Sequence, residues 1–112
     1  MHSEWTILES DWKHLRKVQP AALERLCARA LEEVGRVATS THGTAHERYR
    51  QIWAVLRAHD KEVALAFDDP RRSTALAHLT AMRHLGLVTD EEYAGFSPDL
   101  RERVDFVLAS WK

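Results

Sequence analysis

Two of the seven histidines in this chain are spaced like metal ligands. His42 and His46 are four residues apart, and on one continuous helix both imidazoles would lie on the same face. Gly43 and the expected N-cap Thr44 stand between them, so we expect the pair to be divided between a loop and a helix. The chain has no HExxH motif and only one cysteine. We therefore predict no bound metal and no cofactor.

A third histidine, His59, falls on the apolar stripe of a helical segment, with Asp60 beside it. One interpretation is a half-buried imidazole that is hydrogen-bonded to a carbonyl or a carboxylate. The other is a catalytic or pH-sensing group, which would also need a pocket. We favour the first interpretation and predict no catalytic residue. A metal- or ligand-binding bundle that uses His59, or the pair His42 and His46, is the third-ranked hypothesis for function.

Two adjacent arginines, Arg71 and Arg72, follow Asp69 and Pro70, which we expect to be the N-cap and first residue of a helix. Positive charge in a first helical turn opposes the helix dipole and calls for a compensating anion. We predict that Asp68 or Asp69 supplies it, because adjacent opposite charges pair easily. The alternative is a site at Arg71 and Arg72 for a phosphate or a partner's carboxylate.

Tryptophan is abundant, with four copies, and Trp5 and Trp12 share the apolar stripe of the first segment. Two tryptophans on one amphipathic face can pack in a core or dock onto a second subunit. We predict that Trp5 and Trp12 form an interaction site. We also predict a homodimer, because two-fold dimers are the commonest assembly.

The segment that must position these residues is 44–67, which we predict to be one long helix at the centre of the fold. Its apolar side chains recur at steps of three and four residues from Ala45 to Ala66, which places them on one face. Thr44 and Glu47 have the spacing of a capping box. A helix of this length with a broad apolar face needs other helices against it.

Helical periodicity recurs in five further segments: 4–18, 20–38, 70–85, 89–96 and 97–111. We expect Pro20 to separate the first two and Gly86 to end the helix before it. The chain is predicted to be a single all-α domain, residues 1–112, built as a compact bundle of five or six helices around the central helix. The predicted core is Leu15, Leu23, Leu26, Leu31, Val34, Ile52, Trp53, Leu56, Val63, Leu76, Leu79, Leu85 and Val104. Cys27 is expected to be buried as a small hydrophobe.

The formal charge of −1 gives no indication of bulk attraction to nucleic acid. A local basic patch on the central helix would be the exception, and it would use Arg48, Arg50, Arg57 and Lys61. A DNA-binding transcriptional regulator is therefore the alternative function. It is not favoured, because these four residues are expected to lie on several sides of the helix.

A location in the cytoplasm is the default expectation, because Met1–Trp5 lacks the features of a signal peptide. No apolar run approaches the roughly 20 residues of a membrane helix, so we expect no membrane association. We predict a small soluble protein that acts through protein–protein contacts, as an adaptor, regulatory or self-associating module. We expect no enzymatic activity.

Overall fold

The computed structural model describes residues 5–111, and within that range every regular element is a helix. The elements are α1 (Glu9–Thr39), α2 (Ala45–Phe67), the short 3-10 helix η1 (Arg72–Thr74), α3 (Ala75–His84), α4 (Asp90–Ala94) and α5 (Pro98–Ser110). The predicted all-α class is confirmed. The predicted start of the first helix at residue 4 lies outside the described residues, and residues 5–8 are not helical.

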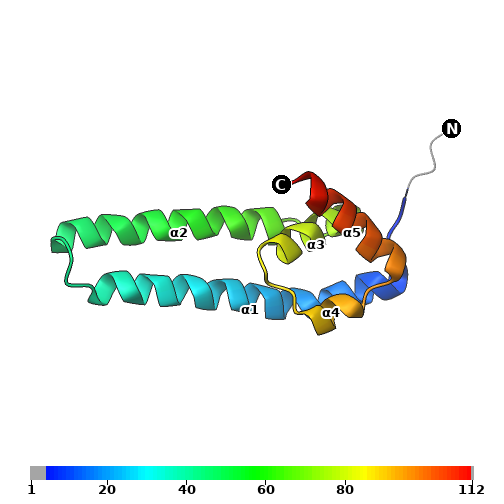
Figure 1. Cartoon of the computed structure of the whole chain (residues 1–112), viewed down its shortest axis with the longest axis horizontal. Coiled ribbons are helices and arrows are strands. Elements are labelled where there is room, and N and C mark those ends of the chain that lie inside the picture. The colour runs from blue at the N-terminus through cyan, green and yellow to red at the C-terminus, as the bar shows by residue number, and fades with distance from the viewer. Residues whose placement is uncertain (1–4, 112) are drawn as a thin grey trace.

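The molecule is elongated, measuring 60 × 29 × 25 Å, because its two longest helices form an antiparallel hairpin that extends beyond the other helices (Figure 1). We call the outer part of this hairpin, residues 27–60, the arm. Residues 72–111, which include α3, α4 and α5, pack against the other end of the hairpin and are called the cap. The cap and the arm therefore follow one another along the long axis of the molecule; the first part of α1 packs against the cap, and its last part belongs to the arm.

The predicted break at Gln19 and Pro20 is wrong, since α1 continues through Pro20 for 31 residues. A proline inside a helix removes one hydrogen bond and costs about 3 kcal/mol. Here Pro20 is on the exposed side of α1, where water can bond to the carbonyl group that loses its partner. Val18, Ala22 and Leu26 are buried on the other side, and their packing holds the helix together across the proline.

The bounds predicted for the second long helix are confirmed: the Thr44 side chain accepts a hydrogen bond from Glu47 N at 3.1 Å, and the helix ends at Phe67. Its place in the fold differs from the prediction. α2 is one side of the arm and contacts α1 and α3, whereas α1 is the longest helix and reaches both the arm and the cap.

The turns of the cap follow from local sequence. Gly86 has a φ of +70°, and Leu87 N donates to Met82 O at 2.9 Å, which ends α3 as predicted. Thr89 and Glu92 form a complete capping box at the start of α4. Ser97 caps α5, with Pro98 in its first turn. The helix end predicted at Gly86 is confirmed, and the observed caps agree with the segments predicted to start at residues 89 and 97.

The start of the next helix was predicted wrongly at Asp69 and Pro70. Asp69 has a φ of +54°, so the chain makes a left-handed turn there, and α3 begins only at Ala75 after the 3-10 turn. Asp residues tolerate this conformation better than most. The Asp69 carboxylate accepts a hydrogen bond from the Arg71 guanidinium and does not cap a helix.

The hydrophobic core lies where α1, α3, α4 and α5 meet, together with the end of α2. Four predicted core residues are fully buried there: Leu15, Leu26, Leu79 and Val104. Six are half-buried: Leu23, Val34, Ile52, Val63, Leu76 and Leu85. The prediction is wrong for Leu31, Trp53 and Leu56, which are exposed, and also for Cys27. All four belong to the arm, where two helices alone cannot enclose a core.

Candidate interaction surface

The arm carries exposed apolar side chains on one of its faces. Leu31 is 70% exposed, Tyr49 61%, Trp53 52% and Leu56 38%. Cys27 is exposed as well. We call these five residues the arm face. Large apolar side chains gathered in this way mark contact sites more often than single exposed ones do.

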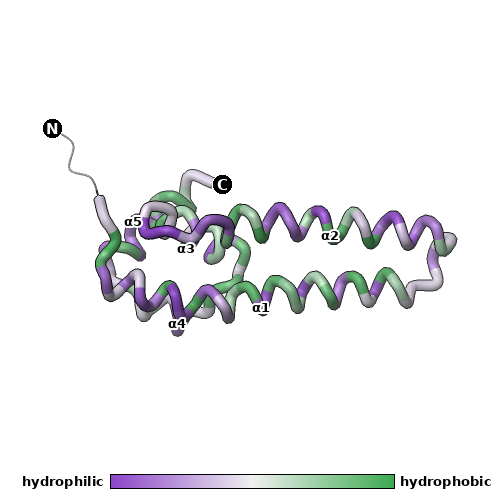
Figure 2. The backbone as a smooth tube through the Cα atoms, turned by 180° about the vertical axis from the view of Figure 1, so that it is seen from behind, coloured by the Kyte–Doolittle hydropathy of each residue, from purple (hydrophilic) through white to green (hydrophobic). Residues whose placement is uncertain are grey.

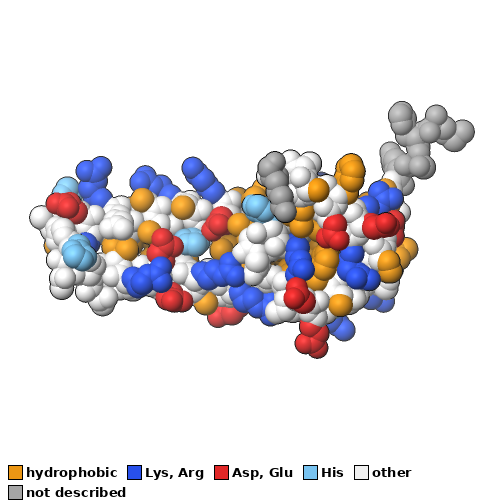
Figure 3. All heavy atoms as spheres, viewed as in Figure 1, with side chains coloured by type: hydrophobic (Ala, Val, Ile, Leu, Met, Phe, Trp, Pro, Cys, Tyr) orange, Lys and Arg blue, Asp and Glu red, His pale blue; other side chains and the backbone are white. Residues whose placement is uncertain are grey.

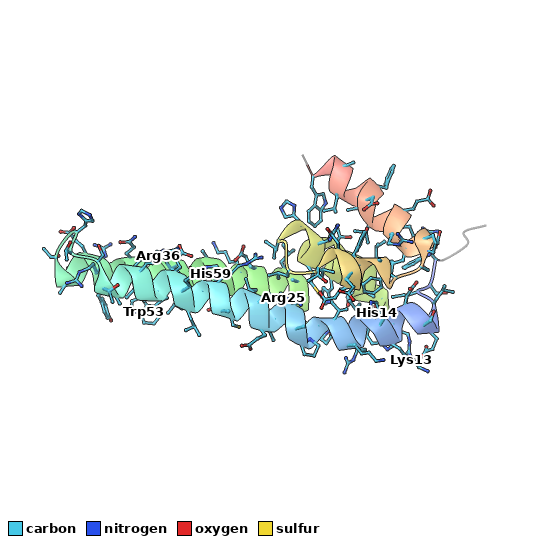
Figure 4. All side chains as sticks on the ribbon, turned by 60° about the horizontal axis from the view of Figure 1, so that its bottom comes forward. Lys13, His14, Arg25, Arg36, Trp53 and His59 are labelled. Carbon is cyan, nitrogen blue, oxygen red and sulfur yellow. The ribbon has the colours of Figure 1, made fainter. Side chains whose placement is uncertain are left out.

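Helical spacing explains why the arm face is continuous. Tyr49, Trp53 and Leu56 are four and three residues apart, so they line one flank of α2. Val55 and His59 are rotated from them toward α1, where they are buried and half-buried. Figure 2 shows hydrophobic residues recurring along both helices of the arm, and Figure 4 places Trp53 on the side of the arm away from Arg36.

A shallow apolar groove of about 250 Å³ runs between the two helices beside these residues. It is lined by Leu26, Cys27, Ala30, Leu31, Leu56, His59, Asp60 and Val63. Cys27 and Leu31 come from α1 and Leu56 comes from α2. The groove therefore joins the flank of α1 that carries Cys27 and Leu31 to the flank of α2 that carries Leu56. The arm face is therefore one surface built by both helices.

His59 joins the two helices of the arm. Its Nε2 lies 2.9 Å from Glu33 Oε2 on α1, and its Nδ1 lies 2.7 Å from Glu62 Oε1 on α2. The hydrogen bond with Glu33 is the main cause that raises the pKa of His59 above its ordinary value of 6.5. Glu62 acts in the same direction, and partial burial opposes both. The imidazolium form is thus the one that links α1 to α2.

Basic side chains follow the edge of α2 that faces away from α1, as Figure 3 shows. Arg50, Arg57 and Lys61 are seven and four residues apart, so helical spacing places them on one edge of α2. All three are exposed, and the described residues hold no carboxylate in an ion pair with any of them. Arg48 differs from this group, because it is half-buried and donates to Ala38 O at 3.0 Å. Three of the four basic residues named from the sequence therefore share one edge.

Trp5 and Trp12 make contacts within the chain. Trp5 Nε1 donates to Asp99 Oδ2 at 3.1 Å, and the Arg103 guanidinium lies 4.9 Å from its ring centre. Arg72 lies 5.4 Å from the ring centre of Trp12, which is half-buried. Both tryptophans pack on the core of the cap, far from the arm. They help to hold the start of the chain against α5 and η1.

Arg71 and Arg72 each have a carboxylate partner. Arg71 pairs with Asp69, as the sequence suggested, and this ion pair lowers the pKa of the Asp69 carboxyl. Arg72 reaches across to Glu9 of α1, with Nη2 at 3.1 and 3.0 Å from the two carboxylate oxygens. The two guanidinium groups therefore diverge to different partners.

His42 and His46 are exposed at the tip of the arm, the first in the loop and the second in α2. Within residues 5–111, no three side chains of His, Cys, Asp or Glu are arranged to hold a metal ion. Over the same range, no helix has both the length and the apolar character needed to cross a lipid bilayer.

The arm face was missed because four of its five residues, Cys27, Leu31, Trp53 and Leu56, were predicted to be buried. A signal for it exists in the sequence. The segments predicted after residue 70 are at most 16 residues long (70–85), or about 24 Å, whereas the predicted central helix 44–67 has 24 residues and measures about 36 Å. Elements of that length can cover only one end of a long hairpin, which leaves the other end with an uncovered stripe.

The fold and the arm face thus define an all-α hairpin protein with an uncovered apolar surface. Comparison of the chain with protein-family models, curated proteins and solved structures finds no match.

Proposed function

We propose that this protein acts through protein–protein contacts made by the arm face, as an adaptor, regulatory or self-associating module rather than as an enzyme. The observation that carries the proposal is the exposure of Leu31, Tyr49, Trp53 and Leu56 on one surface. Aromatic anchors in an apolar patch are typical of the energetically important centre of an interface. A homodimer and a cytoplasmic location are the finer parts of this proposal.

The arrangement of the chain supports a role for the arm in contacts. Polar bonds fasten the cap onto α1: Asp11 accepts from Ser97 N and Oγ at 2.8 and 2.6 Å, and Arg25 binds Glu92 and Leu87 O. Such bonds keep α1 fixed while its outer half projects from the cap. The arm face is thereby presented on the continuation of an anchored helix, and its side chains are exposed.

Site-specific photo-crosslinking in the native cell tests the proposal. A photoreactive amino acid at Leu31 should form adducts with protein, because this position is at the centre of the arm face. The matched control is the same amino acid at Leu65, an exposed leucine of α2 that does not belong to the arm face. Equal adduct yields at the two positions, or none at Leu31, would contradict the proposal.

A second candidate function is DNA binding through Arg50, Arg57 and Lys61. Their alignment on one exposed edge favours it, because a row of cations can follow a phosphate backbone. The test is retention of duplex DNA at low ionic strength, with the Arg50→Ala, Arg57→Ala double variant as comparison. Binding should fall steeply with added salt and weaken in the variant. Absence of salt-dependent binding removes this candidate.

A further inference from the structure

We infer that the partner covering the arm face is a second copy of this chain, with the two arms packed face to face as a four-helix bundle. This inference rests on the proposed function and names its partner. It places the dimer contact on the arm, whereas the sequence had suggested Trp5 and Trp12 at the other end of the molecule.

The surface area of the chain supports this partner. A compact monomer of 12.9 kDa exposes roughly 6,300 Å². This chain exposes 7792 Å², about 1,500 Å² more than that estimate. A stable dimer of standard size buries about 800 Å² on each partner. The excess is therefore large enough to supply such an interface and still leave ordinary surface elsewhere.

The shape of the chain agrees with its area. The radius of gyration is 17.1 Å, whereas a compact chain of this length has one of about 13 Å. Figure 1 shows α1 and α2 extending together away from the cap, and such an extension increases the radius of gyration. Two helices form only one layer, and a hydrophobic core requires at least two layers. A second arm provides the missing layer.

The arm face is also suited to its own copy. A two-fold contact uses the same patch on both subunits, so the patch must complement itself. An apolar flank made by two antiparallel helices meets this condition, because two such hairpins facing each other give the usual four-helix packing. The arm face has aliphatic Leu31 and Leu56 beside aromatic Tyr49 and Trp53, which can interdigitate across the contact. The five residues of the arm face are uncharged, and the exposed charge beside them is Asp60, which lines the groove.

The experiment measures the molar mass of the purified full chain by sedimentation equilibrium over a wide concentration range. The wild type should be a dimer. Leu31→Glu should raise the dissociation constant by at least about tenfold, because each dimer would bury two uncompensated carboxylates. Leu65→Glu makes the same substitution at another exposed leucine and should leave the dimer unchanged. Trp53→Glu should act like Leu31→Glu, which guards against an effect peculiar to one position.

Circular dichroism of each variant is the control for folding, and helix content should be unchanged because the substituted side chains are exposed. A wild type that stays monomeric throughout the concentration range, or equal weakening by Leu31→Glu and Leu65→Glu, would overturn the inference. Its failure can be told apart from that of the proposed function. A monomeric wild type whose Leu31 crosslinks to a different protein retains the contact function and loses only the second copy, whereas absence of any adduct at Leu31 removes both.

Discussion

His59 Nε2 of α2 lies 2.9 Å from Glu33 Oε2 of α1, and this contact crosses the arm at a point where few buried side chains join the two helices. The bond is strongest when the imidazole is protonated. A structural bond in the arm is thereby coupled to pH near neutrality.

The first prediction concerns this pH dependence. The pKa of His59 is raised in the folded protein above its ordinary value of 6.5. The folded state therefore binds the proton more tightly, and the bond adds stability that is fully present below about pH 6.5 and is lost as the pH rises through the folded pKa. Urea unfolding should show that His59→Gln lowers stability by about 1 kcal/mol near pH 5.5 and by less near pH 8.

The control for this prediction is the difference between wild type and His59→Gln at each pH, which cancels the other titrating groups. His78 is one of them: burial lowers its pKa, so its own contribution is lost as the pH falls below about 6.5. A difference that does not change with pH would show that His59 is not protonated preferentially in the folded state.

The second prediction concerns Arg25, which fastens α1 to α4. Its guanidinium donates to Glu92 at 2.6 and 3.0 Å and to Leu87 O at 2.7 Å. Arg25→Ala should lower the free energy of unfolding by about 1–2 kcal/mol, since charge-assisted bidentate bonds are the stronger ones. Arg36→Ala is the matched control, with a single contact of 3.5 Å to Glu32, and should change it by less than about 0.5 kcal/mol. Chemical denaturation of both variants decides the matter, and equal effects would refute the role given to Arg25.

The third prediction concerns Asp11, a buried carboxylate that accepts two hydrogen bonds from Ser97. Asp11→Ala leaves the Ser97 N–H and hydroxyl without their acceptor and should lower stability by about 2 kcal/mol. Asp11→Asn keeps one acceptor oxygen and should cost less. Thermal unfolding of the two variants gives the comparison, and an equal loss for both would mean that packing, not hydrogen bonding, sets the effect.

The fourth prediction concerns Arg72. Its pair with Glu9 lies on the surface, where such pairs contribute little, so Arg72→Ala should change stability by less than about 1 kcal/mol. We also expect sulfate to stabilise the wild type and the Arg71→Ala, Arg72→Ala double variant equally, through exclusion from the protein surface. A larger sulfate effect on the wild type, at equal ionic strength with chloride as reference, would instead reveal an anion site at Arg71 and Arg72.

Local signals in the sequence predicted local structure well. Thr44, Gly86, Thr89 and Ser97 mark the helix ends that the structure has, because capping depends on a few neighbouring residues. Pro20 led to a wrong prediction of a helix break, because the energetic cost of a proline in a helix can be seen in the local sequence. The packing that offsets this cost is made by α1 against the cap, whose residues are distant in sequence. A helical stripe likewise shows that a face is apolar without showing what covers it.

The contacts that were missed join residues far apart in the chain. His59 was expected to be hydrogen-bonded and half-buried, which is confirmed, but its partner Glu33 on α1 follows from the hairpin alone. Arg72 was paired in the prediction with a neighbouring aspartate, and the structure pairs it with Glu9, 63 residues away. Spacing along one helix gives no information on such pairs.

The uneven distribution of buried side chains along α1 has a consequence for local opening. The cap end of α1 contributes Leu15, Val18, Ala22 and Leu26 to the core, whereas beyond Leu26 only Val37 of this helix is buried. Backbone amides in the arm are thus protected mainly by the hairpin itself. They should exchange with solvent deuterium through sub-global openings in which the cap stays folded, so a single continuous helix belongs to two cooperative units.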